Sequence, residues 1–354
     1  MLNRRAFKCL AARVLETCKI DLSIAALRSR MSPAPAVTIL MYHRILPESA
    51  KSLCLSPQGI LVSQENFERQ IAFLSSHYTI ISMDDYVTAR LLHRRVPKRS
   101  IILTFDDGYE DNFTYAFPIL KSFRLPAIIY LSTDYIGDQK LFWQQKINHL
   151  IREWRGRPNP KDIIKNVTSL TQIQKTANQV LKNPENRIAM FELIKNIKRL
   201  SCEERQDFLK NFETHLGLTH YPIEHDRFLT WEAVLEMAQH GISFGSHTAS
   251  HSILTTLKPD HVSQELETSL EVISQHLGFS AYHFSYPNGS FNAGIKEMVQ
   301  KKGYLSALST DSGLNDGKTD LFALKRIHIH DRKTADSSGR FSLSLFRSYV
   351  ANLL

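Results

Sequence analysis

The segment Ile101-Ile-Leu-Thr-Phe-Asp-Asp-Gly-Tyr109 decides the fold, because a run of apolar residues ends there on two carboxylates and a glycine. A short apolar run that is bounded by a turn signal is typical of a buried parallel strand. Asp106 and Asp107 are then expected where this strand opens into a loop. In α/β folds that end of the sheet carries the reactive groups.

Short apolar segments with the character of strands recur along the chain, and amphipathic helices separate several of them. The seven segments are Val37–Met41, Ile101–Phe105, Ala127–Leu131, Ile242–Gly245, His283–Ser285, Leu305–Leu308 and Leu324–Ile329. This alternation predicts an α/β fold with a parallel sheet, and about seven strands would suit an incomplete barrel.

One long stretch breaks the alternation, because it has helical periodicity and hardly any strand signal. Ser201 and Glu204 form a capping box there, and an apolar stripe at helical spacing comprises Ile188, Phe191, Ile194 and Ile197. We expect a helical insertion on a βα loop, acting as a lid, as a substrate-selecting wall or only as a stabilising appendage. The predicted domains are a basic arm in 1–36, a barrel in 37–141 and 226–333, the insertion in 142–225 and a terminal helix in 334–354.

The composition bounds the possible partners. The 354 residues are 43% apolar, which is enough for a large core, and the net charge of +9 favours an anionic partner. Basic and aromatic residues are not concentrated in one pattern, so we expect no nucleic-acid partner. The four cysteines lack CxxC spacing, which indicates neither a disulfide framework nor a cysteine zinc site and favours a reducing compartment.

The N-terminal segment predicts a location. It lacks the apolar core of a secretory signal, and no stretch of the chain is apolar enough for a membrane span, so we expect a cytoplasmic protein. Residues 1–30 carry seven Lys/Arg against two acids, and the apolar residues at helical spacing are Phe7, Leu10, Ala11, Val14 and Cys18. This basic amphipathic helix either attaches to anionic lipid on the inner face of the membrane or packs on the domain.

A second polar motif, Gly245-Ser-His-Thr-Ala-Ser-His251, follows another predicted strand. Histidines four residues apart can share one face of a helical turn, and this strand would deliver them to the same end of the sheet as Asp107. One carboxylate and two imidazoles make a three-ligand metal site with an open position. The other carboxylate, Asp106, is left free as a base.

The chemistry of such a site follows from its charge. A divalent ion bound by two neutral imidazoles and one carboxylate lowers the pKa of water to about 7 and polarises a carbonyl oxygen. Asp106 can accept the proton as that water attacks, and a histidine is the best acid for the leaving amine. Amide or ester cleavage is the natural outcome. A glycosidase would need its carboxylates about 5–9 Å apart, and an iron oxygenase would leave Asp106 unexplained.

The two motifs are similar to those of a known family. Thr104-Phe-Asp-Asp-Gly108 and His247-Thr-Ala-Ser-His251 resemble the first two motifs of the polysaccharide deacetylase family, also called NodB homology or carbohydrate esterase 4. The resemblance implies a distorted (β/α)7 barrel, a catalytic metal that is usually zinc, and removal of N-acetyl groups from amino sugars. It makes Asp106 the base, and Asp107, His247 and His251 the metal ligands.

Further motifs extend the resemblance. Tyr286-Pro-Asn-Gly289 resembles the third motif, in which the N–H of Asn288 would help to hold the oxyanion, with Tyr286 beside the substrate. That motif usually carries an arginine that orients the catalytic Asp, but Ser285 stands near its place, so the partner of Asp106 is open.

The general acid is also implied by the resemblance. Ile39-Leu-Met-Tyr-His43 resembles the fifth motif displaced to the front, as in circularly permuted members that act on poly-N-acetylglucosamine. This similarity implies that His43 is the general acid. His328 and His330 are the reserve candidates, because Ile327-His-Ile-His330 stands where the motif usually lies.

The sequence therefore predicts a metal-dependent hydrolase that removes N-acetyl or related acyl groups from an amino sugar. The substrate would be a cell-surface glycan or its lipid-linked precursor, and the expected cytoplasmic location favours the precursor. The alternative is a catalytically inactive barrel that binds glycan or anionic lipid. The presence of both carboxylates and both histidines of the motifs argues against such decay.

Overall fold

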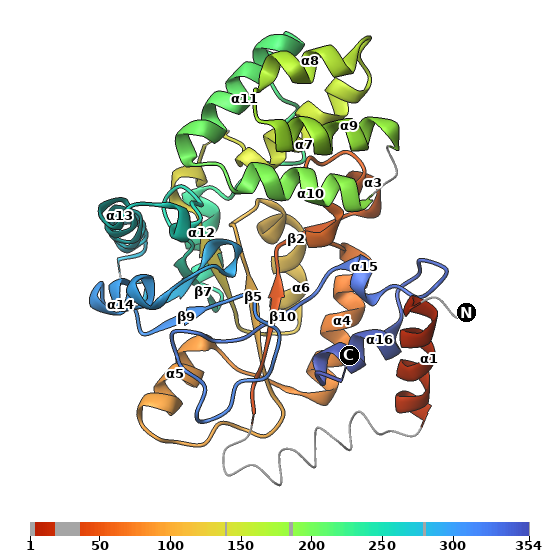
Figure 1. Cartoon of the computed structure of the whole chain (residues 1–354). Coiled ribbons are helices and arrows are strands. Elements are labelled where there is room, and N and C mark those ends of the chain that lie inside the picture. Colours follow the sequence, from red (N-terminus) through yellow and green to blue (C-terminus); the bar gives the residue numbers. More distant parts are fainter. Residues whose placement is uncertain (1–3, 18–35, 139, 184–186, 279–280, 354) are drawn as a thin grey trace.

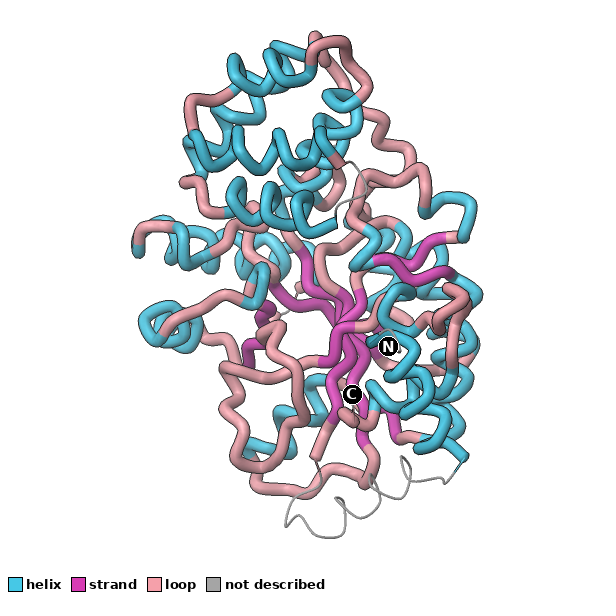
Figure 2. The backbone as a smooth tube through the Cα atoms, turned by 45° about the vertical axis from the view of Figure 1, so that its right-hand side comes forward, coloured by secondary structure: helices cyan, strands magenta, loops and turns pink. Residues whose placement is uncertain are grey.

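A parallel sheet forms the centre of the molecule, and helices surround it (Figure 2). The computed structural model describes residues 4–17, 36–138, 140–183, 187–278 and 281–353. The strand order is β10-β1-β5-β6-β7-β8-β9, and all pairs along this path are parallel. The strands are β1 (Thr38–Tyr42), β5 (Ser100–Phe105), β6 (Ala127–Leu131), β7 (Ile242–Ser246), β8 (His283–Ser285), β9 (Ser306–Leu308) and β10 (Ile327–His328).

The segment before β10 closes the sheet into a barrel. Leu324 pairs with Leu308 of β9 in a parallel bridge, and three residues later the same segment becomes β10 and pairs with β1. The closure is irregular, because the segment changes partner within a few residues. The predicted distorted (β/α)7 barrel is thus confirmed. A short strand β4 (Thr79–Ile80) extends β5, and β2 (Arg44–Leu46) and β3 (Leu61–Ser63) form a separate pair.

Helices cover the outside of the barrel and extend above one of its ends (Figure 1). Those outside the insertion are α1 (Arg4–Thr17), α3 (Glu48–Lys51), α4 (Gln64–His77), α5 (Met83–Leu91), α6 (Phe117–Ser122), α12 (Trp231–Ala238), α13 (Pro259–Leu277), α14 (Ala293–Lys301), α15 (Asp331–Thr334) and α16 (Leu343–Val350). Several begin at a side-chain cap, as α4 does at Ser63 and α5 does at Ser82, because a hydroxyl satisfies an otherwise free N–H of the first turn.

Alternation along the strands separates two apolar layers. In β5, Ile101, Leu103 and Phe105 belong to the large cluster that packs under the helices, whereas Ile102 belongs to the cluster inside the barrel. This period of two places Thr104 and Asp106 on the inner face. The apolar interior therefore ends at a polar layer, and β5 carries a carboxylate into it.

The helical insertion has a hydrophobic core of its own. Its helices are α7 (Trp143–Arg155), α8 (Pro160–Val167), α9 (Thr171–Lys182), α10 (Arg187–Lys198) and α11 (Cys202–Leu216), drawn in yellow and green at the top of Figure 1. Trp154 is fully buried in this core, and its Nε1 donates to Pro160 O. The predicted capping box of Ser201 and Glu204 starts α11.

Only the C-terminal half of the apolar stripe predicted for α10 faces the core of the insertion, because Ile197 is buried there and Ile194 is partly buried against it. Ile188 and Phe191 are 75% and 65% exposed, whereas Leu193 and Ile197 are buried in the core of the insertion. The buried residues Ala189, Leu193 and Ile197 follow one another at intervals of four residues, whereas the predicted stripe used intervals of three. The helix was correctly expected from its periodicity, but the direction of its inner face depends on the neighbouring helices.

The basic helix α1 packs on the C-terminal helix α16. Ala12 is fully buried, Lys8 donates to the hydroxyl of Tyr349, and Arg5 donates to Ala335 O. These contacts fit the interpretation that the helix packs on the domain, while attachment to lipid stays a prediction. Cys18 and the rest of 18–30 lie outside the described residues. Among the helices of the described chain, none has the length and apolar character that a membrane span requires.

Candidate active site

The two carboxylates leave β5 in different directions. Asp106 continues the inner face of the strand and is 2% exposed. Asp107 follows with φ +81° and Gly108 with φ +80°, so the chain turns sharply at the mouth of the barrel. A Cβ at Gly108 would lie 2.9 Å from Leu131 Cδ2, and a residue with a side chain would have to adopt a positive φ there; both effects favour glycine at this position. The left-handed conformation of Asp107 is rare for a residue with a side chain and is typical of functional sites.

The two histidines follow β7 on an irregular loop. The predicted helical turn is wrong, because Thr248 and His251 have φ +67° and +57° and no helix forms between them. Glu265 of α13 sets this conformation: its Oε2 accepts from the N–H groups of both Ala249 and Ser250 at 2.9 Å. The Glu265 carboxylate thus satisfies two backbone N–H groups that a helix would satisfy with its own carbonyl groups. The loop bends around this carboxylate, and both imidazoles are directed toward Asp107.

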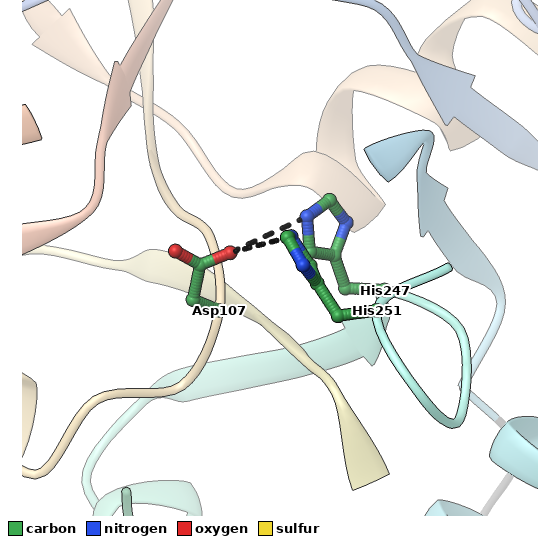
Figure 3. A group of neighbouring side chains, drawn as sticks. All are labelled: Asp107, His247 and His251. Atoms are coloured by element: carbon green, nitrogen blue, oxygen red, sulfur yellow. Dashed lines mark ion pairs between the residues drawn. The ribbon is translucent and has the colours of Figure 1, made fainter. Parts of the chain in front are cut away.

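Asp107, His247 and His251 meet at the mouth of the barrel and point toward one another (Figure 3). Asp107 Oδ1 lies 3.5 Å from His247 Nε2 and 3.3 Å from His251 Nε2. Ligand atoms of a tetrahedral zinc site, with bonds of about 2.1 Å, lie about 3.4 Å apart. The spacing and the donor set, two nitrogens and one oxygen, therefore fit a divalent metal ion.

The protonation states of these groups also suit a metal. Burial lowers the pKa of His247 to about 4, so its imidazole is neutral at pH 7. Burial works against the charge of Asp107, but the neighbouring histidines hold the pKa of this carboxyl below its usual value. His247 Nδ1 donates to Ser285 O at 2.7 Å, which leaves the lone pair of Nε2 free for a ligand bond.

Asp106 is held by an arginine that the sequence did not reveal. Arg326 Nη1 and Nη2 each donate to one carboxylate oxygen of Asp106 at 2.7 Å, and Arg326 is fully buried. Ser285 Oγ donates to Asp106 at 3.3 Å and accepts from Arg326 at 3.0 Å. Burial alone would raise the pKa of Asp106, yet Arg326 and His247 outweigh it and hold the pKa well below its usual range. Asp106 is therefore ionised at neutral pH.

Arg326 answers the question that the third motif left open. The arginine that orients the carboxylate comes from the segment before β10, next to Ser285 on β8, and not from the motif itself. Two charged residues, Lys325 and Arg326, interrupt the strand candidate Leu324–Ile329, and they were the signal in the sequence. The role of Arg326 depends on the sheet order, because β10 pairs with β1 and therefore lies two strands away from β5.

The three candidate acids form one cluster. The ring centroids of His43 and His328 lie 5.1 Å apart, and those of His328 and His330 lie 5.0 Å apart. His43 is close enough to lower the pKa of both Asp106 and Asp107. Burial lowers the pKa of His328 well below its usual value and that of His330 to about 4.

Each of these histidines has a ring nitrogen that is buried without a hydrogen-bond partner within the described chain. The atoms are His43 Nδ1, His328 Nε2 and His330 Nδ1. Buried polar atoms of proteins are normally satisfied, so unpaired ones beside reactive carboxylates suggest a place for a substrate or for water. The geometry brings all three predicted residues together and does not choose among them as the acid.

The third motif forms a turn after β8. Asn288 has φ +59°, and its Oδ1 accepts from Lys198 of the insertion at 2.9 Å. Its role at the oxyanion stays a prediction. The placement of Tyr286 argues against contact with substrate: its buried hydroxyl donates to Phe322 O, and its N–H donates to Leu308 O. Tyr286 therefore packs beside the barrel and supports the turn.

A second buried arginine network lies beside the site, and the sequence did not indicate it. Arg44 follows His43 directly and donates to Asp111 at 2.8 Å and to Asp226 at 2.6 Å. Its guanidinium also stacks 4.2 Å from the ring centroid of Tyr109. Because these residues belong to three separate segments, the network joins the turn after β5 to the end of the insertion.

Comparisons with known proteins agree with this site. The family model described as polysaccharide deacetylase matches residues 93–307. The Bacillus subtilis (strain 168) protein YxkH, whose name places it among polysaccharide deacetylases, is 21% identical over 308 residues, covering 87% of this chain and 76% of its own.

Two further similarities are narrower or concern the fold. A poly-beta-1,6-N-acetyl-D-glucosamine N-deacetylase of Staphylococcus aureus (strain MSSA476) is 34% identical over 79 residues, which cover 22% of this chain and 27% of that protein. The Streptococcus pyogenes deacetylase PplD, solved with acetate, superposes with a TM-score of 0.56 at 19% identity, covering 85% of this chain and 95% of that one. With the family model matching more than half of its residues, the chain belongs to the polysaccharide deacetylase family, a family of hydrolases.

Proposed function

We propose that this protein is a metal-dependent hydrolase that removes N-acetyl or related acyl groups from an amino sugar of a cell-surface glycan or of its lipid-linked precursor. One observation carries the proposal: three residues at ligand spacing lie beside an ionised carboxylate, Asp106, that is not one of them. A binding module would not need a metal site and a separately held base next to each other.

The residues divide the reaction between them. Asp107, His247 and His251 would hold a divalent ion, which when bound would supply a Lewis acid for the acyl carbonyl and for water. Asp106 accepts the proton of the attacking water, and Arg326 fixes the direction of its lone pairs. In this proposal His43 gives a proton to the leaving amine, with His328 and His330 as the alternatives.

The donor set supports zinc as the metal. Two imidazole nitrogens and one carboxylate oxygen suit zinc better than calcium or magnesium, which prefer oxygen ligands. A fourth position remains for water or substrate, since the described residues supply three ligands. We therefore propose a zinc site of the open, catalytic kind.

The substrate class is supported by the relatives. The Staphylococcus aureus relative acts, by its name, on poly-beta-1,6-N-acetyl-D-glucosamine. The net charge of +9 on the protein favours an anionic substrate, and the phosphate of a lipid-linked sugar would supply the negative charge. We propose an acetylated amino-sugar glycan or its lipid-linked precursor on this basis, together with a cytoplasmic location at the inner face of the membrane.

The test is direct. The purified 354-residue chain is loaded with zinc, and the acetate and free amine that it produces are measured on N-acetylglucosamine oligomers and on a lipid-linked N-acetylglucosamine. Release of acetate by the wild type, and its loss in Asp106→Asn and Asp107→Ala variants, is the expected result. A wild type that binds these sugars without deacetylating them would instead support a binding module. Faster turnover of the oligomers than of the lipid-linked sugar would overturn the preference for the precursor.

A further inference from the structure

The first turn of the helical insertion touches one metal ligand. The ring of Phe142 stacks on the imidazole of His251, with centroids 4.1 Å apart and planes inclined by 15°. Gln144 Nε2 lies 3.5 Å from His251 Nδ1. The other end of this amide, Gln144 Oε1, is buried and has no hydrogen-bond partner in the described part of the chain.

The orientation of His251 indicates that Gln144 can act as a hydrogen-bond acceptor for its ring. Its Nε2 faces Asp107, so Nε2 is the nitrogen that would bind a metal. A neutral imidazole that binds through Nε2 carries its proton on Nδ1, and that N–H points at the amide of Gln144. A half-turn of the amide exchanges its nitrogen and oxygen. The oxygen that lacks a partner then accepts the Nδ1–H.

Such an acceptor is a regular part of metal sites, because the second hydrogen bond of a ligating histidine fixes its ring and raises its basicity. His247 already has its acceptor in Ser285 O. We propose that Gln144 is the corresponding positioning residue for His251, so that the insertion completes the metal site of the barrel. This inference rests on the proposed function, because it requires a metal at these ligands.

The insertion is anchored so that it can hold this position. Gln145 Oε1 accepts from the N–H of Phe142 at 2.9 Å, and its Nε2 donates to Asp226 at 2.8 Å. Arg44 holds the same Asp226. The two ends of the insertion are thus tied together and to the chain beside His43. Because Phe142 and Gln144 belong to the same turn, the tie fixes both contacts with His251.

The experiment measures zinc affinity of the full-length chain by competition with a chromophoric chelator. Gln144→Leu keeps the size of the side chain and removes the acceptor, so we expect affinity to fall by about tenfold or more. Gln144→Glu keeps an acceptor and should bind zinc as the wild type does. Gln172→Leu, on an exposed position of α9, is the matched control and should change nothing. Thermal unfolding of the metal-free proteins checks that all variants fold.

The zinc affinities of the variants show whether the inference, the proposed metal site or both are wrong. Wild-type affinity in Gln144→Leu overturns the inference, and so does an equal loss in Gln144→Leu and Gln144→Glu, since then shape rather than the acceptor matters. An Asp107→Ala variant separates this from the proposed function. If Asp107→Ala loses zinc but Gln144→Leu does not, only the inference fails. If Asp107→Ala binds zinc as the wild type does, or if the wild type binds none, the metal site itself is wrong and both proposals fail.

Discussion

Replacing Arg326 by methionine tests the part of the site that the sequence did not reveal. Asp106 and Arg326 are 2% and 0% exposed, so the variant would leave a carboxylate buried without its cation. Breaking a buried pair by removing one partner costs about 3–5 kcal/mol of folding stability. Ser285 remains as a donor to Asp106, which places the expected loss toward the lower end of that range.

The pH dependence of this loss has a definite sign. In the wild type, the pKa of Asp106 is held below its ordinary value, so its ionised form stabilises the fold above about pH 4, and acid removes that contribution. Without Arg326, burial raises the pKa of Asp106 above its ordinary value. The ionised form then destabilises the variant at neutral pH. The difference in stability between wild type and Arg326→Met should therefore shrink as the pH falls toward about 4.

Urea denaturation followed by tryptophan fluorescence at several pH values measures this difference. An Arg326→Met/Asp106→Asn variant removes the unpaired charge and should regain much of the stability that Arg326→Met loses. Deacetylation by Arg326→Met should fall by about 100-fold or more at pH 7, because the base is neither fixed nor fully ionised. A loss below about 1 kcal/mol that is constant with pH would refute the assignment of Arg326 as the partner of Asp106.

Four other perturbations follow from the same geometry. His43→Ala should lower deacetylation by about 100-fold or more while zinc affinity, measured by calorimetry, stays unchanged; equal activity would move the acid to another histidine. Glu265→Gln should lower zinc affinity about tenfold, because the loop that carries His251 loses its carboxylate acceptor, and titration with a chelator would show whether it does. Leu150→Ala in the core of the insertion should cost about 2–5 kcal/mol by urea denaturation, against less than about 0.5 kcal/mol for the more exposed Leu170→Ala. Dialysis against a chelator should abolish deacetylation, zinc should restore it, and activity that survives complete metal removal would contradict the metal-dependent mechanism.

The strands and the reactive end of the sheet could be predicted from the sequence because both depend on local patterns. Apolar runs of four to six residues mark buried strands, and the run from Ile101 to Phe105 stops on the carboxylates. The alternation of side chains along a strand then places Asp106 inside the barrel. The spacing of His247 and His251 after a second strand indicated the metal ligands, and similarity to known motifs added His43 and an expected role for each group.

The tertiary structure decided the contacts between segments far apart in the chain. Arg326 reaches Asp106 across 220 positions because β10 pairs with β1, next to β5, and no local pattern encodes that pairing. The His247–His251 loop is shaped by Glu265 of another helix, so a spacing of four predicted a turn that does not form.

The sequence by itself thus determined which chemical groups the protein carries and which edge of the sheet presents them, since strand periodicity is a property of neighbouring residues. Only the folded chain decided which charge meets Asp106, which residues contact His251 and which face of α10 is buried. Hydrogen bonds and ion pairs form between atoms that meet in space, and such meetings depend on the packing of every element at once.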